Sequence, residues 1–454
     1  MKRTQSLILL TAILASFVAF LDGSVVGVAL PQISEHLGGG LQTQQWVNDA
    51  YLITLGTLIL AAGSLSDIFG RKKIITIGLI GFLVTSLLCA VAPSAEVLII
   101  ARALQGVAGA LLVPSSLALI ISAFSGAAQA RAIGVWTAWT GVAFIIGPLV
   151  GGLLVDLLSW RWIFVINVIP IVVALIFLKR LDITEKLNES KTIDIPGIIL
   201  GAFGLGGIVF ALIEQGNYGW ANPVIWGSCV IGILCFIGFI AHEARTKNPM
   251  LPLNLFSVGN FSAGNIATFL IYAALSLQGF ILVIFLQQVA GFTATAAGLA
   301  SLPVTIMMLL LSSRFGALAG KYGPRLFMTL GPIISGLGML WMLTVQVPLN
   351  YWIQLLPGVI LFGLGLAITV APLTSAILGS IKPSQAGIGS AVNNAVSRIA
   401  GLIAVAIIGI FVGSELDIGG FHTGVLICAG LLVTGGIVSF IGIKNTPKEN
   451  PQKA

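Results

Sequence analysis

Four ionisable residues lie inside long apolar stretches of the sequence: Asp22, Asp49, Arg102 and Arg398. An ionised side chain at mid-depth in hydrocarbon costs at least ~2.5–3.5 kcal/mol, so such residues usually face a polar cavity and have a function. Burial favours the neutral form of a carboxyl group, whereas a nearby guanidinium favours the anion. An aspartate whose distance from Arg102 changes between two conformations would therefore bind and release a proton. The alternative is a fixed, structural ion pair between Asp22 and Arg102.

Long apolar segments recur along the chain and must position these residues. Of its 454 residues, 57% are hydrophobic and 8% are charged, and this charged fraction is about a third of that in a soluble domain. A bilayer core about 30 Å thick requires roughly 20 apolar residues per helix. The sequence therefore predicts an all-α membrane protein with fourteen spans, at about residues 7–30, 45–65, 74–93, 97–123, 132–155, 162–178, 194–213, 223–241, 262–288, 294–316, 326–347, 351–372, 385–412 and 421–443.

The distribution of charge predicts how the spans cross the membrane. The chain carries 22 Lys and Arg residues and 15 Asp and Glu residues, a net charge of +7, and the basic residues gather at both termini and in alternate connections. Connections rich in Lys and Arg face the cytoplasm, so we expect both termini to be cytoplasmic. The net charge then reflects topology, and we expect no nucleic-acid partner. All four cysteines lie inside predicted spans with no metal-site or disulfide spacing, so we expect no metal.

One short sequence pattern occurs twice. GSLSDIFGRKK at residues 63–73 and GALAGKYGPRLF at residues 316–327 place Gly, Leu and a second Gly at matching offsets, followed by a basic residue. Internal repeats of this kind are common in membrane transporters. We therefore divide the chain into a six-helix bundle at 1–181, a linker with two extra transmembrane helices at 182–257, and a second six-helix bundle at 258–454. The first residues of the linker, DITEKLN, could form a short helix on the membrane surface.

The first copy of this pattern resembles the cytoplasmic loop signature of the major facilitator superfamily. The resemblance runs through Gly63, Leu65, Asp67, Gly70, Arg71, Lys72 and Lys73. RALQGVAGA resembles the fourth-span signature of that superfamily, through Arg102, Gln105, Gly106 and Gly109. AFIIGPLVGG resembles the fifth-span antiporter signature, through Gly147, Pro148, Gly151 and Gly152, but has Ala143 where Gly is usual.

The first span is similar to that of the fourteen-span drug:proton antiporters in this superfamily. LDGSVVGVALP follows their signature, with Ser24 and Gly27 where Thr and Asn are usual. Together with the extra helix pair, the resemblance covers essentially the whole chain. It implies a major facilitator fold of two six-helix bundles plus two extra helices, with Asp22 and Arg102 as the proton-coupling residues.

The residue types of the repeated loop suggest a conformational latch. Gly70 follows the expected end of the second span and permits a tight turn there. Asp67 can form an ion pair with Arg71 or meet the positive end of the helix dipole of the span expected at 326–347. Such contacts would hold the two halves together on the cytoplasmic side. The alternative is that the basic residues of this loop only fix the topology.

The fifth span has the composition of a packing hinge. Gly147, Gly151 and Gly152 allow another helix to approach closely. Pro148 removes one backbone hydrogen bond and bends the helix. This antiporter helix hinge requires no contact with a substrate.

Candidate substrate contacts lie at the start of the second span, where QWVNDAYLI contains Trp46, Asp49 and Tyr51. Family members that expel lipophilic cations often carry an acid three residues after this Trp. The resemblance therefore implies that Asp49 is the charge partner of a cation, with Trp46 or Tyr51 as a cation–π face. Aromatic residues at a helix end are equally expected in the interfacial belt of a membrane protein. Asn394 and Arg398 are further candidates for substrate binding.

The resemblance implies a proton-coupled antiporter in a bacterial cytoplasmic (inner) membrane that exports amphipathic, cationic drugs or toxic compounds by alternating access. The alternative is a proton-coupled transporter of a different small metabolite or lipid on the same fold. We expect a monomer whose partners are protons, a lipophilic cation and the lipid bilayer, with no cofactor. We expect no enzyme activity, because the three histidines lie at the ends of predicted spans and the sequence shows no catalytic constellation around them. An ion channel would not need the repeated loop.

Overall fold

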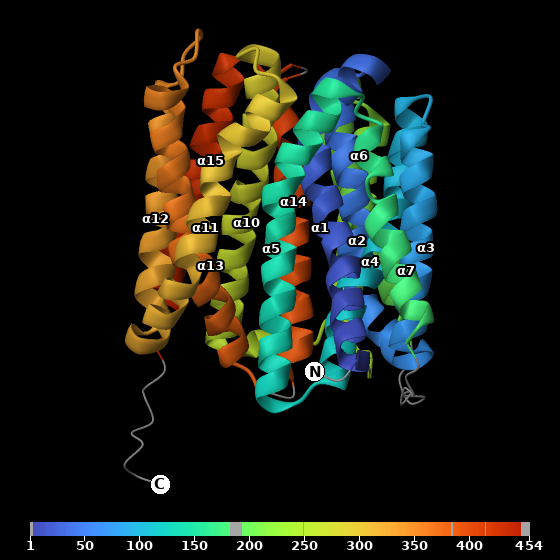
Figure 1. Ribbon diagram of the computed structural model, residues 1–454. Helices are drawn as coiled ribbons and strands as arrows, with labels where there is room; N and C mark the ends of the chain where they lie inside the picture. The colour runs from blue at the N-terminus through green and yellow to red at the C-terminus, as the bar shows by residue number, and fades with distance from the viewer. Residues whose placement is uncertain (1–2, 182–192, 248, 383–384, 414, 446–454) are drawn as a thin grey trace. The chain divides into compact units, whose positions relative to one another are not determined.

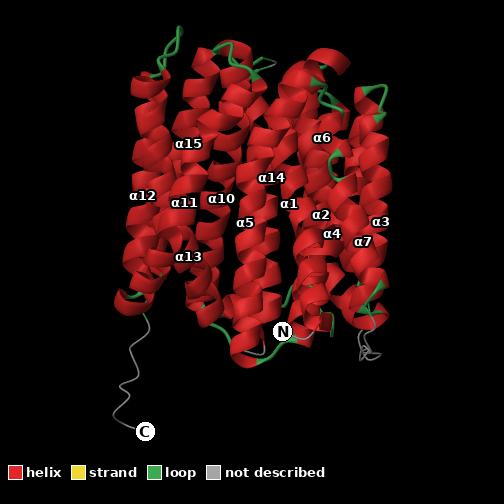
Figure 2. Cartoon of the chain, viewed as in Figure 1, coloured by secondary structure: helices red, strands yellow, loops and turns green. Residues whose placement is uncertain are grey.

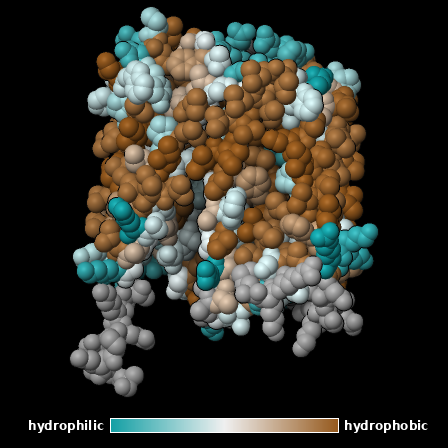
Figure 3. Space-filling model, viewed as in Figure 1, coloured by the Kyte–Doolittle hydropathy of each residue, from teal (hydrophilic) through white to brown (hydrophobic). Residues whose placement is uncertain are grey.

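The computed structural model of the protein describes residues 3–181, 193–247, 249–382, 385–413 and 415–445. Within these ranges all regular structure is helical, as Figure 2 shows. Fourteen helices there are long and apolar enough to cross a membrane, which confirms the predicted number of spans. Hydrophobic side chains cover the middle of these helices and hydrophilic ones gather toward their ends (Figure 3). The DITEKLN segment lies outside the described residues.

The helices follow the predicted spans closely. The first eight spans consist of α1 (Arg3–Leu37), α2 (Gly40–Phe69), α3 (Arg71–Ala90), α4 (Ala95–Ala123), α5 (Gly126–Leu157), α6 (Trp162–Val165) with α7 (Val168–Lys179), α8 (Ile195–Tyr218) and α9 (Pro223–Glu243). The other six consist of α10 (Gly259–Ile284) with η2 (Phe285–Val289), α11 (Ala294–Tyr322), α12 (Pro324–Trp341) with η3 (Met342–Thr344), η4 (Tyr351–Leu355) with α13 (Leu356–Gly379), α14 (Ala386–Val412) and α15 (Ile418–Gly442). The short helix η1 (Leu253–Ser257) precedes α10.

The first helix is longer than predicted. It continues through Pro31 to Leu37, well past the expected end near residue 30. It stops where Gly38 and Gly39 adopt φ angles of 83° and 84°, a conformation that glycine adopts without steric penalty and that commonly ends helices.

The sixth span is broken. Its helix α6 ends at Val165 and α7 begins at Val168, so Ile166 and Asn167 form a turn between them. Pro170 lies four residues after Ile166 and has no backbone N–H, so it cannot complete the helical hydrogen bond to the Ile166 carbonyl. The break places the Asn167 side chain in the interior, where it is fully buried.

The described helices form two compact units. The first contains residues 1–252, 276–302 and 401–424, and the second contains residues 253–275, 303–400 and 425–454. In the first unit α2 packs along α4, α1 along α5, α3 along α4, and α8 along α9, and Figure 1 shows α1, α2 and α4 as neighbours. In the second unit α12 packs along α13. The bundle boundaries after residues 181 and 257 stay a prediction.

The two copies of the repeated loop have the same backbone conformation. Gly70 joins α2 to α3 with φ 92° and ψ 136°, and Gly323 joins α11 to α12 with φ 89° and ψ 153°. These angles are accessible to glycine and strained for other residues. The second glycine of each copy is therefore required by the turn itself, and the repeat seen in the sequence is also a repeat of structure.

Replacement of these turn glycines should destabilise the protein. We expect Gly70→Ala to lower the free energy of unfolding by about 1–3 kcal/mol, because alanine pays the strain of this conformation. Gly323→Ala should cost more, since its Cβ would lie 2.3 Å from Oδ1 of Asn445. Thermal unfolding in detergent measures both. Gly63→Ala is the control, because no atom lies within 4 Å of a Cβ there; an equal loss in all three would contradict the strain argument.

Candidate functional site

A buried ion pair between α1 and α4 is the centre of the site. Nη1 of Arg102 lies 2.6 Å from Oδ2 of Asp22. The Asp22 side chain has no exposed surface and the Arg102 side chain is 1% exposed. The structure therefore brings together the acid and the base predicted to act as a pair. Both charges lie away from lipid and water, so each depends on its partners for stabilisation.

Three polar side chains complete the surroundings of Asp22. Its Oδ1 accepts hydrogen bonds from Nε2 of Gln105 at 3.0 Å and from Nδ2 of Asn167 at 3.0 Å. The Ser86 hydroxyl accepts from the same Gln105 nitrogen at 2.9 Å and from Asn167 at 3.4 Å. All of these residues are fully buried. We call Asp22, Ser86, Arg102, Gln105 and Asn167 the buried charge network.

Arg102 has several acceptors other than Asp22. Its Nε donates to the Val47 carbonyl at 3.1 Å, and its Nη1 donates to Oε1 of Gln105 at 2.7 Å. The guanidinium carbon lies 4.4 Å from the centre of the Tyr51 ring and 5.9 Å from that of Phe164. Cations are stabilised over aromatic faces, most strongly in desolvated sites. Tyr51, a candidate substrate contact from the sequence, thus contacts the proton-coupling candidate Arg102.

The glycines of α4 allow this geometry. A Cβ at Gly106 would lie 2.3 Å from the Tyr51 carbonyl oxygen, and one at Gly109 would lie 2.9 Å from the Tyr51 hydroxyl. Thr54 Oγ1 also donates to the Ala103 carbonyl at 2.7 Å. The backbones of α2 and α4 are therefore close enough for Arg102 to reach the carbonyl of α2.

Asp49 lies in a different environment from Asp22. Its side chain is fully buried, and Oδ1 accepts a hydrogen bond from Nδ2 of Asn48 at 2.9 Å. Its Oδ2 has no hydrogen-bond partner among the described residues. One turn earlier, Nε1 of Trp46 donates to Oε1 of Glu214 at 2.8 Å, and its ring lies 6.1 Å from that of Phe210. Trp46 thus ties α2 to the extra helix α8.

The remaining substrate candidates, Asn394 and Arg398, lie on α14 within the second unit. The Asn394 side chain is exposed and donates to the Ser390 carbonyl of its own helix at 3.1 Å. Its neighbour Asn393 donates to Thr268 Oγ1 at 2.7 Å and so joins α14 to α10. Asn393 therefore acts as an interhelical tie, whereas Asn394 is exposed and bonds to its own helix.

The latch candidates cluster around the first turn glycine. Nη2 of Arg71 lies 3.4 Å from Oδ1 of Asp67, and the two side chains are 28% and 29% exposed. Gly70 separates these partners, and the Gly63 carbonyl accepts a hydrogen bond from Ser66 at 2.9 Å. Arg71 is one of the two partners expected for Asp67, and the structure shows this contact.

The glycines of α5 bring that helix onto α1. A Cβ at Gly147 would lie 1.8 Å from Ser24 Oγ, and one at Gly151 would lie 3.2 Å from the Val25 Cα. Pro148 lies between them inside the helix. The expected close approach of another helix is therefore present, and α1 is that helix.

Gly152, the last residue of the fifth-span signature, faces the start of α11. A Cβ there would lie 2.5 Å from the Thr295 Cα. One turn later, the Asp156 carboxylate accepts from the Ala294 and Thr295 N–H groups at 3.0 and 2.8 Å. These two N–H groups belong to the first turn of α11, where an acid is favoured by the helix dipole. Within the first unit, α5 thus both packs against α11 and caps it.

The departures from the family signatures at Ala143 and Gly27 have structural counterparts. Ala143 is fully buried, and its carbonyl accepts a hydrogen bond from Ser24 at 3.1 Å. Gly27 has no atom within 4 Å of a Cβ position. The absence of a side chain at Gly27 leaves space, whereas the region of Ala143 is closely packed.

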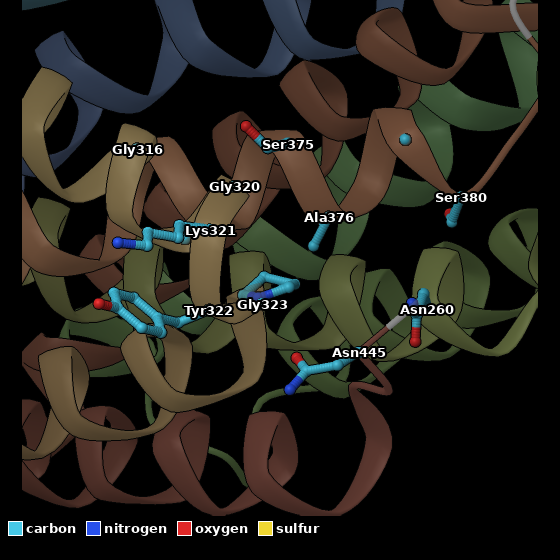
Figure 4. A pocket seen from close by; sticks show the side chains of 13 residues that line it. Asn260, Gly316, Gly320, Lys321, Tyr322, Gly323, Ser375, Ala376, Ser380 and Asn445 are labelled. Carbon is cyan, nitrogen blue, oxygen red and sulfur yellow. The ribbon is translucent and has the colours of Figure 1, made fainter. Parts of the chain in front are cut away.

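A cavity of about 340 Å³ lies in the second unit, at the second copy of the repeated loop. Figure 4 shows Lys321 and Tyr322 on one side of it and Asn260 on the other. Oδ1 of Asn445 accepts from the Arg325 N–H at 3.2 Å, which caps α12. This cavity contains none of the predicted substrate residues.

Sequence reasoning did not find all of the buried charge network. Gln105 was predicted only as part of a motif, and Ser86 was not predicted. Two signals were available. Gln105 follows Arg102 by three residues, one helical turn, and Asn167 precedes Pro170 in an otherwise apolar span.

Fourteen membrane-crossing helices, a turn repeated in both halves and a buried ion pair define a polytopic transport protein with internal repeats. A sequence profile of the Major Facilitator Superfamily matches residues 12–261 and 264–454. The chain belongs to this superfamily of membrane transporters.

Similar proteins agree with this assignment. The chain is 34% identical over 407 residues to the methylenomycin A resistance protein of Bacillus subtilis (strain 168), covering 89% of this chain and 87% of that protein. It is 34% identical over 423 residues to the multidrug resistance protein Stp of Mycobacterium tuberculosis (strain CDC 1551 / Oshkosh), covering 90% and 76%. The xylose transporter XylE from E. coli has the same fold, with a TM-score of 0.67, 14% identity and 97% and 98% of the two chains covered.

Proposed function

We propose that this transporter exports amphipathic, cationic drugs or toxic compounds in exchange for protons. Its relatives include proteins named for resistance to methylenomycin A and to multiple drugs. In this proposal the protein acts as a monomer in a bacterial cytoplasmic membrane. Both termini would lie in the cytoplasm, because the basic residues gather at the termini and in alternate connections. Alternating access of two six-helix bundles would carry the substrate across.

The observation that carries this proposal is the set of acceptors around Arg102. When Asp22 binds a proton, its attraction for the guanidinium is lost. Arg102 then still has the Val47 carbonyl, Gln105 Oε1 and the Tyr51 ring within contact distance. A buried cation is stable only while it is hydrogen-bonded or paired. The network can therefore accept a proton at Asp22 without leaving Arg102 unpaired, which is what a coupling site requires and a purely structural ion pair does not.

A separate acid is available for the substrate. Asp49 is buried, has one oxygen without a partner among the described residues, and follows Trp46 by three residues on α2. A carboxylate beside an aromatic side chain suits a lipophilic cation, which offers both charge and apolar surface. Asp49 would attract the charge and Trp46 or Tyr51 would contact the apolar part. Asn394 and Arg398 of α14 are further candidates for substrate binding.

The turn around Asp67 and Arg71 would be the cytoplasmic latch of this cycle. Its residues are only partly buried, so contacts there can form and break at low cost. The α5 glycines would provide the hinge, because Gly147, Gly151 and Gly152 pack directly on neighbouring helices. Movement of α5 would thus be transmitted to α1, which carries Asp22.

Export of a fluorescent organic cation tests the proposal. Inside-out membrane vesicles would receive an imposed pH gradient, and cation uptake would be compared for wild type, Asp22→Asn and Asp49→Asn. We expect Asp22→Asn to reduce uphill uptake to the level of vesicles without the protein, since asparagine cannot carry the proton. Asp49→Asn should lose cation transport and keep proton-driven transport of a neutral drug. Glu415→Gln, which removes an exposed acid, is the control.

Uphill, pH-driven transport by Asp22→Asn would show that another residue couples the proton. Equal loss of cationic and neutral drugs in Asp49→Asn would assign Asp49 to coupling or folding rather than to substrate charge. Binding of the cation to the purified variants distinguishes these two outcomes.

A further inference from the structure

A second group of buried acids lies on the extra helix pair, at the start of α8 and the end of α9. Asp194 caps α8, because its Oδ1 accepts a hydrogen bond from the Gly197 N–H at 3.0 Å. Glu243 is the last residue of α9, and its Oε2 accepts from the Leu251 N–H at 3.0 Å. The two residues are 8% and 2% exposed. Each acid thus uses one oxygen to hold a neighbouring backbone segment.

The other oxygens of the two acids face each other. Asp194 Oδ2 and Glu243 Oε1 have no hydrogen-bond partner among the described residues. A Cβ at Gly197 would lie 2.6 Å from the first and 3.0 Å from the second, so both oxygens border the space that the glycine leaves. Because each oxygen lies within 3.0 Å of that one point, the two oxygens are close neighbours. A hydrogen bond between them requires one proton, because two carboxylates have no donor.

One histidine contacts this pair of acids. Nε2 of His242 lies 2.7 Å from Asp194 Oδ1 and 3.1 Å from Thr246 Oγ1, so its N–H can donate to the acid. The packing around the pair is apolar: Ala61 of α2, Phe239 of α9 and the connector residues Met250 and Leu251 form a hydrophobic cluster with Ile198 of α8. The next basic residues along the chain, Arg245 and Lys247, are exposed.

This environment disfavours two ionised carboxylates. Two adjacent buried carboxylates repel each other, and one of them then retains its proton. A single shared proton removes the repulsion and satisfies both orphaned oxygens. The remaining negative charge stays on carboxyl groups that the Gly197 and Leu251 N–H groups and His242 contact.

We propose that Asp194 and Glu243 bind one proton between them at neutral pH and so form a second proton site, on the extra helix pair and apart from Asp22. With the proton bound, Glu243 stays in place and holds the Leu251 N–H. Loss of the proton leaves two repelling carboxylates, which separate and release the connector that follows α9. The site goes beyond the proposed drug export and does not depend on it.

Infrared spectroscopy of the purified full-length protein tests the shared proton directly. The difference spectrum between wild type and Glu243→Gln at neutral pH should show the loss of one protonated-carboxyl band. Asp194→Asn should remove the same band, because the asparagine amide then donates the hydrogen bond and Glu243 no longer needs a proton. Glu415→Gln should leave the band unchanged. Absence of the band from the wild-type difference spectra would overturn the proposal.

Hydrogen exchange of the Leu251 amide tests the consequence for the connector. After correction for intrinsic exchange, protection in wild type should fall about tenfold per pH unit over the pH range in which the closed pair holds the proton and the opened pair does not, because one proton is then released per opening. Glu243→Gln and Asp194→Asn should keep Leu251 protected with no such slope, since each amide mimics the protonated acid. The proposal would be contradicted if Leu251 protection in wild type did not fall with pH in this way. It would also be contradicted if the same pH dependence persisted in both variants.

Discussion

Replacement of Arg102 by glutamine is expected to lower the free energy of unfolding by about 3–5 kcal/mol, the usual cost of removing one partner of a buried ion pair. The variant leaves Asp22 fully buried with only the neutral donors Gln105 and Asn167. It also leaves the Val47 carbonyl without its guanidinium partner. Thermal or denaturant unfolding of the purified protein in detergent measures this loss, and drug transport should be lost with it.

The double variant Asp22→Asn with Arg102→Gln should be more stable than Arg102→Gln alone. Removing both charges leaves neutral amides that can bond to each other, whereas removing one leaves an uncompensated charge. Asp22→Asn alone should be the mildest of the three, because Arg102 keeps Gln105, Val47 and the Tyr51 ring. The order of stabilities therefore tests whether the acceptors around Arg102 support it independently of Asp22.

Two further variants sharpen this test. Arg102→Lys keeps the charge but cannot donate to Asp22 and to the Val47 carbonyl at once, so an intermediate loss of stability is expected. Arg131→Gln removes an exposed arginine and should be neutral. If Asp22→Asn were as destabilising as Arg102→Gln, the surroundings of Arg102 would not provide the alternative support that the coupling proposal needs.

Substitution of the α5 glycines should distinguish a close contact with backbone atoms from a close contact with a side chain. Gly152→Ala should strongly impair folding and transport, because the added Cβ would lie 2.5 Å from the backbone of Thr295. Backbone atoms cannot move without displacing α11, and the carboxylate that caps this helix, Asp156, would move away with α5. Overpacking of this kind typically costs about 1–3 kcal/mol and sometimes more. The measurements are thermal unfolding and drug uptake by vesicles.

The stability lost in Gly147→Ala should be recoverable by a second substitution, unlike that lost in Gly152→Ala. Its Cβ would collide with the side chain of Ser24, at 1.8 Å from Oγ. The double variant Gly147→Ala with Ser24→Gly should therefore recover most of the lost stability, whereas Thr295→Gly should not rescue Gly152→Ala. Gly141→Ala on the same helix is the control, since no atom lies within 4 Å of a Cβ there. Equal rescue of both positions would contradict the distinction between side-chain and backbone contacts.

The sequence predicted the number of spans because hydropathy depends only on composition within a window. It also predicted that Asp22 and Arg102 would meet, since few ionisable residues lie in apolar spans and each needs a partner. The break between α6 and α7 was not predicted, although Pro170 is consistent with it. A proline limits where a helix can continue, but the fold determines which freed polar group turns inward, and here it is Asn167.

The finer contacts could not be read from the sequence, because they depend on which face each helix presents to its neighbours. Trp46 and Tyr51 were grouped with Asp49 as substrate contacts. In the structure Trp46 bonds to Glu214 of an extra helix and Tyr51 lies on Arg102. Five residues correspond to about 140° of rotation on an α-helix, so these two side chains point in different directions. Adjacent positions in a motif therefore do not imply a common site.

The two repeated turns share a shape but respond differently to ionic strength. The turn at Gly70 contains opposite charges, and the Asp67 and Arg71 side chains are both partly exposed. Salt screens charges in such a position over about 10 Å at 0.1 M. The turn at Gly323 is held instead by the neutral Asn445 amide, which caps the following helix. Added salt can therefore loosen the first turn while leaving the second unchanged, so the two halves of a symmetric fold differ in their sensitivity to the surrounding solution.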